Sequence, residues 1–156
     1  MPKEIERKFL LRPDKWPQLS KPAGQHYRQG YLLTDPQKTI RVRATDTHGF
    51  ITIKGLNTGA TRDEYEYEIP VQEANELLDK FAVSELSKIR YKIPFQGHTW
   101  EVDEFLGKNA GLIVAEIELV REDEDFDIPD WIAREVTGDE RYYNSNLTIR
   151  PFKEWD

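Results

Sequence analysis

The chain has 156 residues, and its 22 Lys and Arg against 29 Asp and Glu give a formal net charge of −7. It contains no cysteine, which excludes disulfides, zinc–thiolate sites and thiol nucleophiles, and its acidic balance argues against a nucleic-acid partner, because such binders rely on basic patches. The length predicts one domain over residues 1–156. No apolar run approaches the roughly 18 residues of a membrane span, and the charged N-terminus is unlike a signal peptide. We therefore expect a cytoplasmic protein with no membrane partner.

Most of the chain is expected to form β-strands. Short runs of alternating apolar and charged residues, bounded by turn signals, predict strands. These runs cover residues 3–11, 27–34, 39–46, 50–54, 62–69, 85–93, 99–106 and 112–120. One helix is expected to open at Pro70, since apolar residues from Val71 to Phe81 recur at helical spacing. About eight strands with few helices predict a mainly β (α+β) fold, a barrel or a sandwich, and a closed barrel leaves no exposed strand edge.

The C-terminal quarter shows weaker signals. The acidic run 121–127 reads as a solvated loop, and Pro129-Asp130-Trp131 as the start of a short helix. Thr137 and Glu140 have the spacing of a capping box for a further helix. Residues 145–150 are expected to form a last short strand.

Several predicted strands carry charges of one sign on a single face, because residues i and i+2 of a strand share a face. The faces are Glu4 and Glu6 with Lys8, Arg41 and Arg43, Glu64 with Glu66 and Glu68, Lys88 and Arg90, Glu101 and Asp103, and Glu116 and Glu118, while Lys54 lies opposite Ile51 and Ile53. An ordinary sheet with its charges in solvent accounts for any one strand. Like charges about 4 Å apart repel by roughly 4 kcal/mol at an effective dielectric near 20. Strand faces of opposite charge that point into one barrel would relieve part of that repulsion, and bound ions would relieve the rest.

The residue types indicate which ions these would be. Clustered carboxylates without histidine or cysteine suit a hard cation, Mg²⁺ or Mn²⁺. Clustered arginine and lysine suit phosphate oxygens. A cation bridging carboxylates and phosphates is the usual arrangement of Mg²⁺ in phosphoryl chemistry. The pattern therefore predicts a charged tunnel that accepts a short polyphosphate.

Taken in order, these motifs resemble those of the CYTH family, also called triphosphate tunnel metalloenzymes. They are ExExK (Glu4–Lys8), the tyrosine of RQGYL (Tyr31), RxR (Arg41–Arg43), TxKG (Thr52–Gly55), an acidic strand (Arg62–Glu66), KxRY (Lys88–Tyr91), ExD (Glu101–Asp103) and ExE (Glu116–Glu118). The resemblance covers residues 4 to about 150. It implies a closed antiparallel eight-stranded barrel with a few peripheral helices. It also implies a divalent-metal-dependent reaction on a triphosphate.

The resemblance also implies roles for individual residues. Metal ligands would be Glu4, Glu6, Asp103, Glu116 and Glu118; phosphate ligands would be Arg41, Arg43, Lys54, Lys88, Arg90 and Arg141. Lys8 would pair with Tyr31 to activate water, since a nearby ammonium favours the phenolate. Glu64 is expected behind the metal ligands, and Glu101 as an ion-pair partner. Relatives often carry lysine after Arg-Tyr in the C-terminal segment, where this chain has Tyr143.

These expectations favour a metal-dependent hydrolase that splits inorganic tripolyphosphate into diphosphate and phosphate. A class IV adenylate cyclase and a thiamine triphosphatase stay open, because the motifs would contact only phosphates and metal. A non-catalytic polyphosphate-binding module is a further alternative, against which the two intact ExE pairs argue. Oligomeric state is also open, a homodimer being one option.

Overall fold

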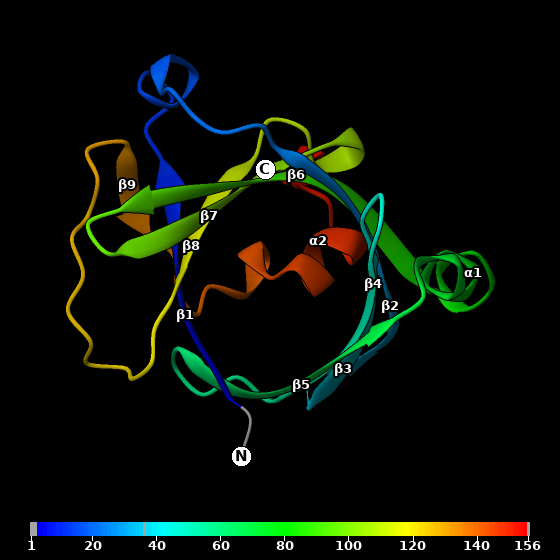
Figure 1. Cartoon of the computed structure of the whole chain (residues 1–156). Helices are drawn as coiled ribbons and strands as arrows, with labels where there is room; N and C mark the ends of the chain where they lie inside the picture. The colour runs from blue at the N-terminus through cyan, green and yellow to red at the C-terminus, as the bar shows by residue number, and fades with distance from the viewer. Residues whose placement is uncertain (1–2, 36, 156) are drawn as a thin grey trace.

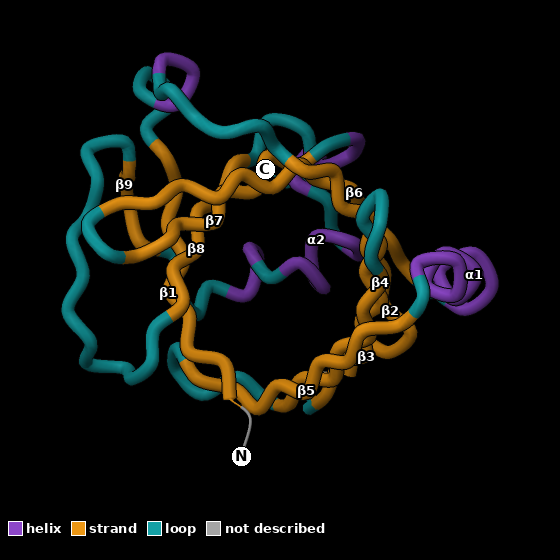
Figure 2. The backbone as a smooth tube through the Cα atoms, in the orientation of Figure 1, coloured by secondary structure: helices purple, strands orange, loops and turns teal. Residues whose placement is uncertain are grey.

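The computed structural model describes residues 3–35 and 37–155, and nearly half of these residues lie in strands around a central opening (Figure 1). The strands are β1 (Lys3–Leu11), β2 (Gln25–Asp35), β3 (Lys38–Ala44), β4 (Gly49–Gly55), β5 (Thr61–Ile69), β6 (Ser84–Phe95), β7 (His98–Phe105), β8 (Ile113–Glu118) and β9 (Ile132–Glu135). The tube in Figure 2 shows the strands forming a ring. The helices are α1 (Val71–Phe81) and α2 (Asn144–Ile149), beside short 3₁₀ turns.

The ring is a closed antiparallel barrel of eight strands, as the sequence predicts. Hydrogen-bonded neighbours follow the order β5-β4-β3-β2-β6-β7-β8-β1, and a further pairing between β5 and β1 closes it. The closing register sets Lys3 opposite Asp63 and Ile5 opposite Thr61. β1 then pairs with β8 from Glu6 to Leu10 and with β9 from Phe9 to Leu11. Because β5 pairs only with residues 3–5 of β1, the edge of β1 at residues 9–11 is open to β9.

Two of the three hydrophobic clusters lie outside the barrel wall, and the charged faces point inward. On β1 the alternation puts Phe9 in a cluster with Trp100 and Ile117, while Glu4 and Lys8 line the interior. Trp16, from the 3₁₀ turn Trp16–Gln18, joins the same outer cluster. A second cluster lies on the outside of the wall, under α1. The third, which contains Leu86, Phe105 and Val114, lies under the C-terminal segment on the same strand faces as Lys88, Asp103 and Glu116, on the inner side of the wall. Period-two alternation therefore explains how strands with one charged face are stabilised by apolar packing on the other face.

Helix α1 covers the outside of β3 and β4. Ala74 and Leu78 are buried against Val42 and Ala44. At Gly49 a Cβ would lie 2.6 Å from the Ala74 Cβ, so glycine is what allows the helix this close to β4. Phe81, at the end of the helix, stays 61% exposed. Neither helix of the described residues has the length and apolar character needed to cross a bilayer.

The acidic run 121–127 forms a loop, as predicted, but His98 anchors it. The His98 Nε2 lies 2.6 Å from Glu124 Oε2, and the backbone N–H of Val120 donates to Glu124 Oε1 at 2.7 Å. Phe126 packs edge-on against Trp100. The loop is therefore attached to the outer core.

The sequence prediction was wrong on three points near the C-terminus. No helix begins at Trp131: Trp131 is buried in the outer core and leads into β9, because β1 offers it a free edge beside β8. Thr137 does not cap a helix. Its hydroxyl accepts from the Lys8 backbone N–H at 2.9 Å, and Asp139 caps the 3₁₀ turn Glu140–Tyr142 instead.

The third error is the expected strand at 145–150, which is helix α2. Local β-branched residues favoured a strand, but no strand edge of the closed ring is free there. A helix instead buries Leu147 completely in the cluster that contains Leu86 and Tyr142. Tertiary packing thus overrides the local preference. In Figure 1 the segment that carries α2 is seen inside the outline of the ring.

Candidate active site

The barrel encloses a cavity of about 300 Å³ whose walls are mostly charged. Twelve of the fourteen predicted site residues line it: Glu4, Glu6, Lys8, Tyr31, Arg41, Arg43, Lys54, Glu64, Lys88, Arg90, Glu116 and Glu118. They come from β1, β2, β3, β4, β5, β6 and β8, so strands distant in the sequence converge on one volume. Asp103 and Arg141 do not line the cavity.

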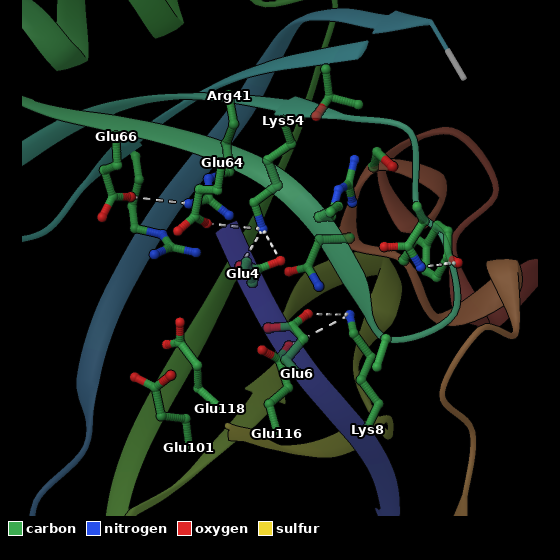
Figure 3. Close-up of a pocket in the computed structure, with 18 of the residues that line it drawn as sticks. Glu4, Glu6, Lys8, Arg41, Lys54, Glu64, Glu66, Glu101, Glu116 and Glu118 are labelled. Carbon is green, nitrogen blue, oxygen red and sulfur yellow. Dashed lines mark hydrogen bonds and ion pairs between the residues drawn. The ribbon is translucent and has the colours of Figure 1, made fainter. Parts of the chain in front are cut away.

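One acidic group surrounds Lys54. Its Nζ lies 2.9 Å from Glu4 Oε2 and 3.5 Å from Glu64 Oε2 (Figure 3). Burial pushes the pKa of Glu4 upward, but the Lys54 ammonium outweighs it and lowers that pKa to about 2. Burial and then the neighbouring Glu4 raise the pKa of Glu64 to about 7. Glu4 and Glu64 are therefore a carboxylate pair in which one member holds a proton near neutral pH.

A second acidic group surrounds Lys8. The Lys8 Nζ lies 3.5 Å from Glu116 Oε1 and 3.9 Å from Glu6 Oε1 (Figure 3). Burial, followed by the charges of Glu116 and Glu4, raises the pKa of Glu6 well above its ordinary value. Burial would lower the pKa of Lys8, but Glu116 and Glu6 outweigh it and raise it. Glu118 lies opposite Glu6 in the ladder, and burial and Glu4 raise its pKa too.

The opposing wall carries the cations. Arg41 donates to Thr52 Oγ1 at 3.1 Å and to Glu66 Oε1 at 3.3 Å. Burial, with Arg41 and Arg90 nearby, lowers the pKa of Arg43 to about 10. The Tyr27 ring lies between two guanidiniums, 4.9 Å from that of Arg43 and 5.2 Å from that of Arg90. Buried cations that depress one another's pKa favour an anionic ligand.

Asp103, expected as a metal ligand, occupies a different position. It is 1% exposed, and its carboxylate accepts from Lys88 Nζ at 2.8 Å and from Arg90 Nε at 2.7 Å. Burial opposes ionisation, but Arg90 and Lys88 outweigh it and lower the pKa of Asp103. Asp103 therefore orients two cations from behind. Glu101, expected as an ion-pair partner, lies 3.4 Å from Arg90.

Arg141, expected as a phosphate ligand, points away from the cavity. Its guanidinium is paired with Asp139 at 2.8 Å, and its side chain is 60% exposed. It packs over the Tyr142 and Trp155 rings on the outer surface. The 3₁₀ turn Glu140–Tyr142 sets this direction, because it buries Tyr142 and leaves Arg141 outside.

Sequence reasoning missed the uncharged residues that complete the cavity. Tyr143 and Asn144 follow the 3₁₀ turn and line the cavity, as does Asn57 from the β4–β5 loop. Asn57 Nδ2 donates to the Tyr143 hydroxyl at 2.8 Å, and the Lys8 Nζ lies 5.8 Å from the Tyr143 ring centre. The one signal in the sequence was the departure at Tyr143, where relatives often carry lysine.

Tyr31 lines the same cavity as Lys8. Its hydroxyl accepts a long hydrogen bond of 3.4 Å from Gln29 Nε2, and the side chain is 4% exposed. Tyr31 contributes to the electrostatics of Lys8, although Glu116, Glu6 and Glu4 contribute more. Both side chains therefore line the same cavity.

The acidic wall suits a hard cation by its chemistry. All its donors are carboxylate oxygens, the set that Mg²⁺ and Mn²⁺ prefer. Three of these carboxylates, Glu6, Glu64 and Glu118, have raised pKa values, and a bound cation would favour their ionised forms. In residues 3–35 and 37–155, no group of three or more acidic or histidine side chains is already gathered as a metal site. Lys8 and Lys54 lie between the carboxylates instead.

Comparison with known proteins identifies relatives along the whole chain. The CYTH domain family matches residues 2–148. The chain is 54% identical over 156 residues to an inorganic triphosphatase of Acetivibrio thermocellus, covering 99% of each sequence. It is 36% identical over 155 residues to an inorganic triphosphatase of Nitrosomonas europaea, covering 94% of this chain and 97% of that one. The crystal structure of the inorganic triphosphatase NE1496 superposes with a TM-score of 0.65 at 33% identity, covering 96% of each chain.

Proposed function

The chain belongs to the CYTH family, and from this premise we propose that it is a metal-dependent hydrolase that splits inorganic triphosphate into diphosphate and phosphate. The observation that carries the proposal is one enclosed cavity with cations on one wall and carboxylates on the other. A volume of about 300 Å³ is at the lower end for small-molecule sites. That size favours a small inorganic substrate, and the two triphosphatase relatives support the same choice.

The basic residues would hold the triphosphate. The N–H donors come from two strands, β3 and β6, which lie on either side of β2. They belong to Arg41, Arg43, Lys88 and Arg90. Arginine contacts phosphate oxygens with two parallel donors, and lysine acts as a point charge. Because these donors are fixed before the substrate arrives, they also stabilise the charge that develops during phosphoryl transfer.

The acidic residues would hold Mg²⁺ or Mn²⁺. Glu4, Glu6, Glu116 and Glu118 supply the oxygen ligands, with Glu64 behind Glu4. When bound, such a cation neutralises phosphate charge and lowers the pKa of bound water. Binding it requires that Lys54 and Lys8 give up part of their contact with the carboxylates.

Lys8 and Tyr31 would activate the attacking water. Glu116 and Glu6 keep the Lys8 ammonium charged, because their attraction outweighs the effect of burial and raises its pKa. Tyr31 lines the same cavity, and its hydroxyl would contact the attacking water. Glu6 and Glu116 hold that ammonium beside the acidic wall.

Phosphate release from a panel of substrates tests the proposal. Purified protein is incubated with tripolyphosphate, ATP and thiamine triphosphate, with Mg²⁺ or Mn²⁺ and with EDTA. We expect tripolyphosphate to give the highest kcat/KM and EDTA to abolish release. Cyclic AMP as the main product from ATP would replace the proposal with a cyclase. Binding of tripolyphosphate without any release would indicate a binding module.

The metal assignment is tested by the double variant Glu4→Gln with Glu6→Gln. We expect it to lose turnover by at least about a hundredfold at saturating Mg²⁺, because two oxygen ligands lose their charge. The matched control is Glu73→Gln with Glu76→Gln, two exposed positions on α1 outside the barrel. Turnover that survives in the first variant would show that these carboxylates do not hold the metal.

A further inference from the structure

Two side-chain amides connect the cationic wall to the C-terminal segment. Gln29, on β2, is fully buried, and its Oε1 accepts from Arg43 Nε at 3.1 Å. Its Nε2 donates to Asn144 Oδ1 at 3.1 Å. The same Asn144 oxygen accepts from Lys88 Nζ at 2.8 Å. A continuous chain of hydrogen bonds thus runs from Arg43 through Gln29 and Asn144 to Lys88.

We propose that Gln29 and Asn144, the amide pair, are positioning residues that hold Arg43 and Lys88 in the orientation that binds the triphosphate. This inference rests on the proposed function and extends it to two uncharged residues. Neither residue belongs to the charged motifs of the sequence. Asn144 lines the cavity next to Tyr143, so the last segment of the chain contributes to substrate binding through Lys88.

Counting donors shows what the amide pair leaves free. Lys88 has three N–H donors; Asp103 and Asn144 take two of them, and one is left for a phosphate oxygen. Arg43 uses its Nε on Gln29, which leaves both Nη groups. Each cation is therefore fixed on one side and available on the other.

An amide is suited to this task because it accepts a hydrogen bond without cancelling charge. Asp103 already places a full negative charge beside Lys88 and Arg90. A second carboxylate in place of Asn144 would neutralise the wall and weaken its attraction for a polyanion. Gln29 and Asn144 satisfy buried donors while the excess positive charge remains for the substrate.

The amide pair is separable from general docking of the C-terminal segment. That docking has its own contacts: Leu147 is fully buried in the cluster that contains Leu86 and Tyr142, and Asn57 donates to the Tyr143 hydroxyl. Asn146 offers a matched control on the same helix, because its Nδ2 donates to the Glu140 carbonyl at 2.6 Å and does not reach the cavity. Loss of Asn146 weakens the segment without touching Arg43 or Lys88.

The test measures tripolyphosphate binding by calorimetry in EDTA, together with steady-state kcat and KM in Mg²⁺, for Gln29→Met, Asn144→Ala, the double variant and Asn146→Ala. We expect each single variant to weaken binding and raise KM about tenfold, with kcat within about twofold. The double variant should lose little more than either single one, because the residues act as one unit. Asn146→Ala should match the wild type, and thermal unfolding should show all four folded.

Wild-type affinity for tripolyphosphate in both single variants would overturn the proposed positioning role of the amide pair. So would a double variant whose loss of affinity equals the product of the two single losses. An equal loss in Asn146→Ala would show that docking of the segment is what matters, and would overturn it as well. If Gln29→Met does not fold, the comparison of tripolyphosphate affinity and KM between Asn144→Ala and Asn146→Ala is sufficient to test the proposal. A wild-type protein that neither binds nor hydrolyses tripolyphosphate would instead refute the proposed function and this inference together.

Discussion

The guanidinium of Arg90 donates to both carboxylate oxygens of Asp103, at 2.7 and 2.9 Å, inside the barrel wall. Such a bidentate pair fixes the plane of the guanidinium. Lys88 donates to the same carboxylate at 2.8 Å, so one acid restrains two of the proposed phosphate ligands. The oxygens of Asp103 accept hydrogen bonds from two cations of the protein itself, so we predict that the glutamates of β1 and β8 bind the metal without it.

Asp103→Asn separates these two roles. We expect KM for tripolyphosphate to rise at least about tenfold and the half-saturating Mg²⁺ concentration to stay within about twofold. Unfolding should become easier by about 3–5 kcal/mol, because a buried ion pair loses its anion. Kinetics over a range of Mg²⁺ and a denaturant titration measure both effects. A shifted metal requirement with unchanged KM would restore Asp103 as a metal ligand.

Arg141→Ala should leave kcat and KM for tripolyphosphate within about twofold of the wild type. Arg141 is paired with Asp139 on the outer surface and does not reach the cavity. Arg41→Ala is the contrasting variant, since Arg41 is buried in the cationic wall, and it should raise KM at least about tenfold. Equal effects of the two substitutions on KM would return Arg141 to the substrate site.

The metal-free protein should gain stability from Glu64→Gln only at higher pH. Burial and Glu4 raise the pKa of Glu64 from 4.5 to about 7. A raised carboxyl pKa means that the folded protein binds this proton more tightly than the unfolded chain does, so its stabilising effect is lost as pH rises through about 7. Glutamine never ionises. The melting temperature of the variant should therefore equal that of the wild type near pH 5 and exceed it near pH 8.

Thermal unfolding in EDTA at the two pH values measures this difference. Glu68→Gln, an exposed position on the same strand, is the control and should follow the wild type at both. Added Mg²⁺ or Mn²⁺ should stabilise the wild type more at pH 8 than at pH 5, because a cation competes with protons for the carboxylates. A Glu64→Gln variant that is less stable than the wild type at pH 8 would refute the protonated carboxylate pair.

Tyr31→Phe should cut kcat by about a hundredfold or more while KM changes little, because the ring is kept and only the hydroxyl is lost. Tyr67→Phe, 57% exposed on the outside of β5, is the matched control. The pH dependence of kcat in the wild type and in Lys8→Met adds a second readout. Unchanged turnover in Tyr31→Phe would remove the tyrosine from the reaction and leave it a wall residue.

Strand alternation was sufficient to predict a mainly β fold, a barrel or a sandwich, with charged strand faces, and the resemblance to the CYTH family implied the closed barrel. Glu4, Glu6 and Lys8 share a face by spacing alone, and that face does line the cavity. The errors lie where the neighbour matters more than the local sequence. Trp131 leads into β9 because β1 has a free edge, and residues 144–149 are helical because a helix buries Leu147. Neither condition can be read from those residues themselves.

Within the site, the charged residue types could be predicted from the sequence, but the orientation of each side chain could not. Asp103 and Arg141 belong to motifs of the right chemistry, but their ion-pair partners set where they point: Arg90 on the neighbouring strand for Asp103, and Asp139, two residues earlier, for Arg141. Gln29 and Asn144 carry no charge and follow no spacing rule. Their part in the site depends on contacts between β2, β6 and the C-terminal helix, and only a three-dimensional structure brings these together.

The register of β1 has a consequence for how the chain reaches its native state. Glu6 pairs with Glu118, and Phe9 pairs with Glu135. Residues 6–11 of β1 therefore pair with strands near the other end of the sequence, β8 and β9. Contacts between segments so distant in sequence slow folding, since loop closure must precede the contacts that compensate it. During synthesis β1 emerges with no partner, its apolar face uncovered. The acid-rich opposite face keeps that early segment charged, which discourages it from pairing with another copy before its own β8 appears.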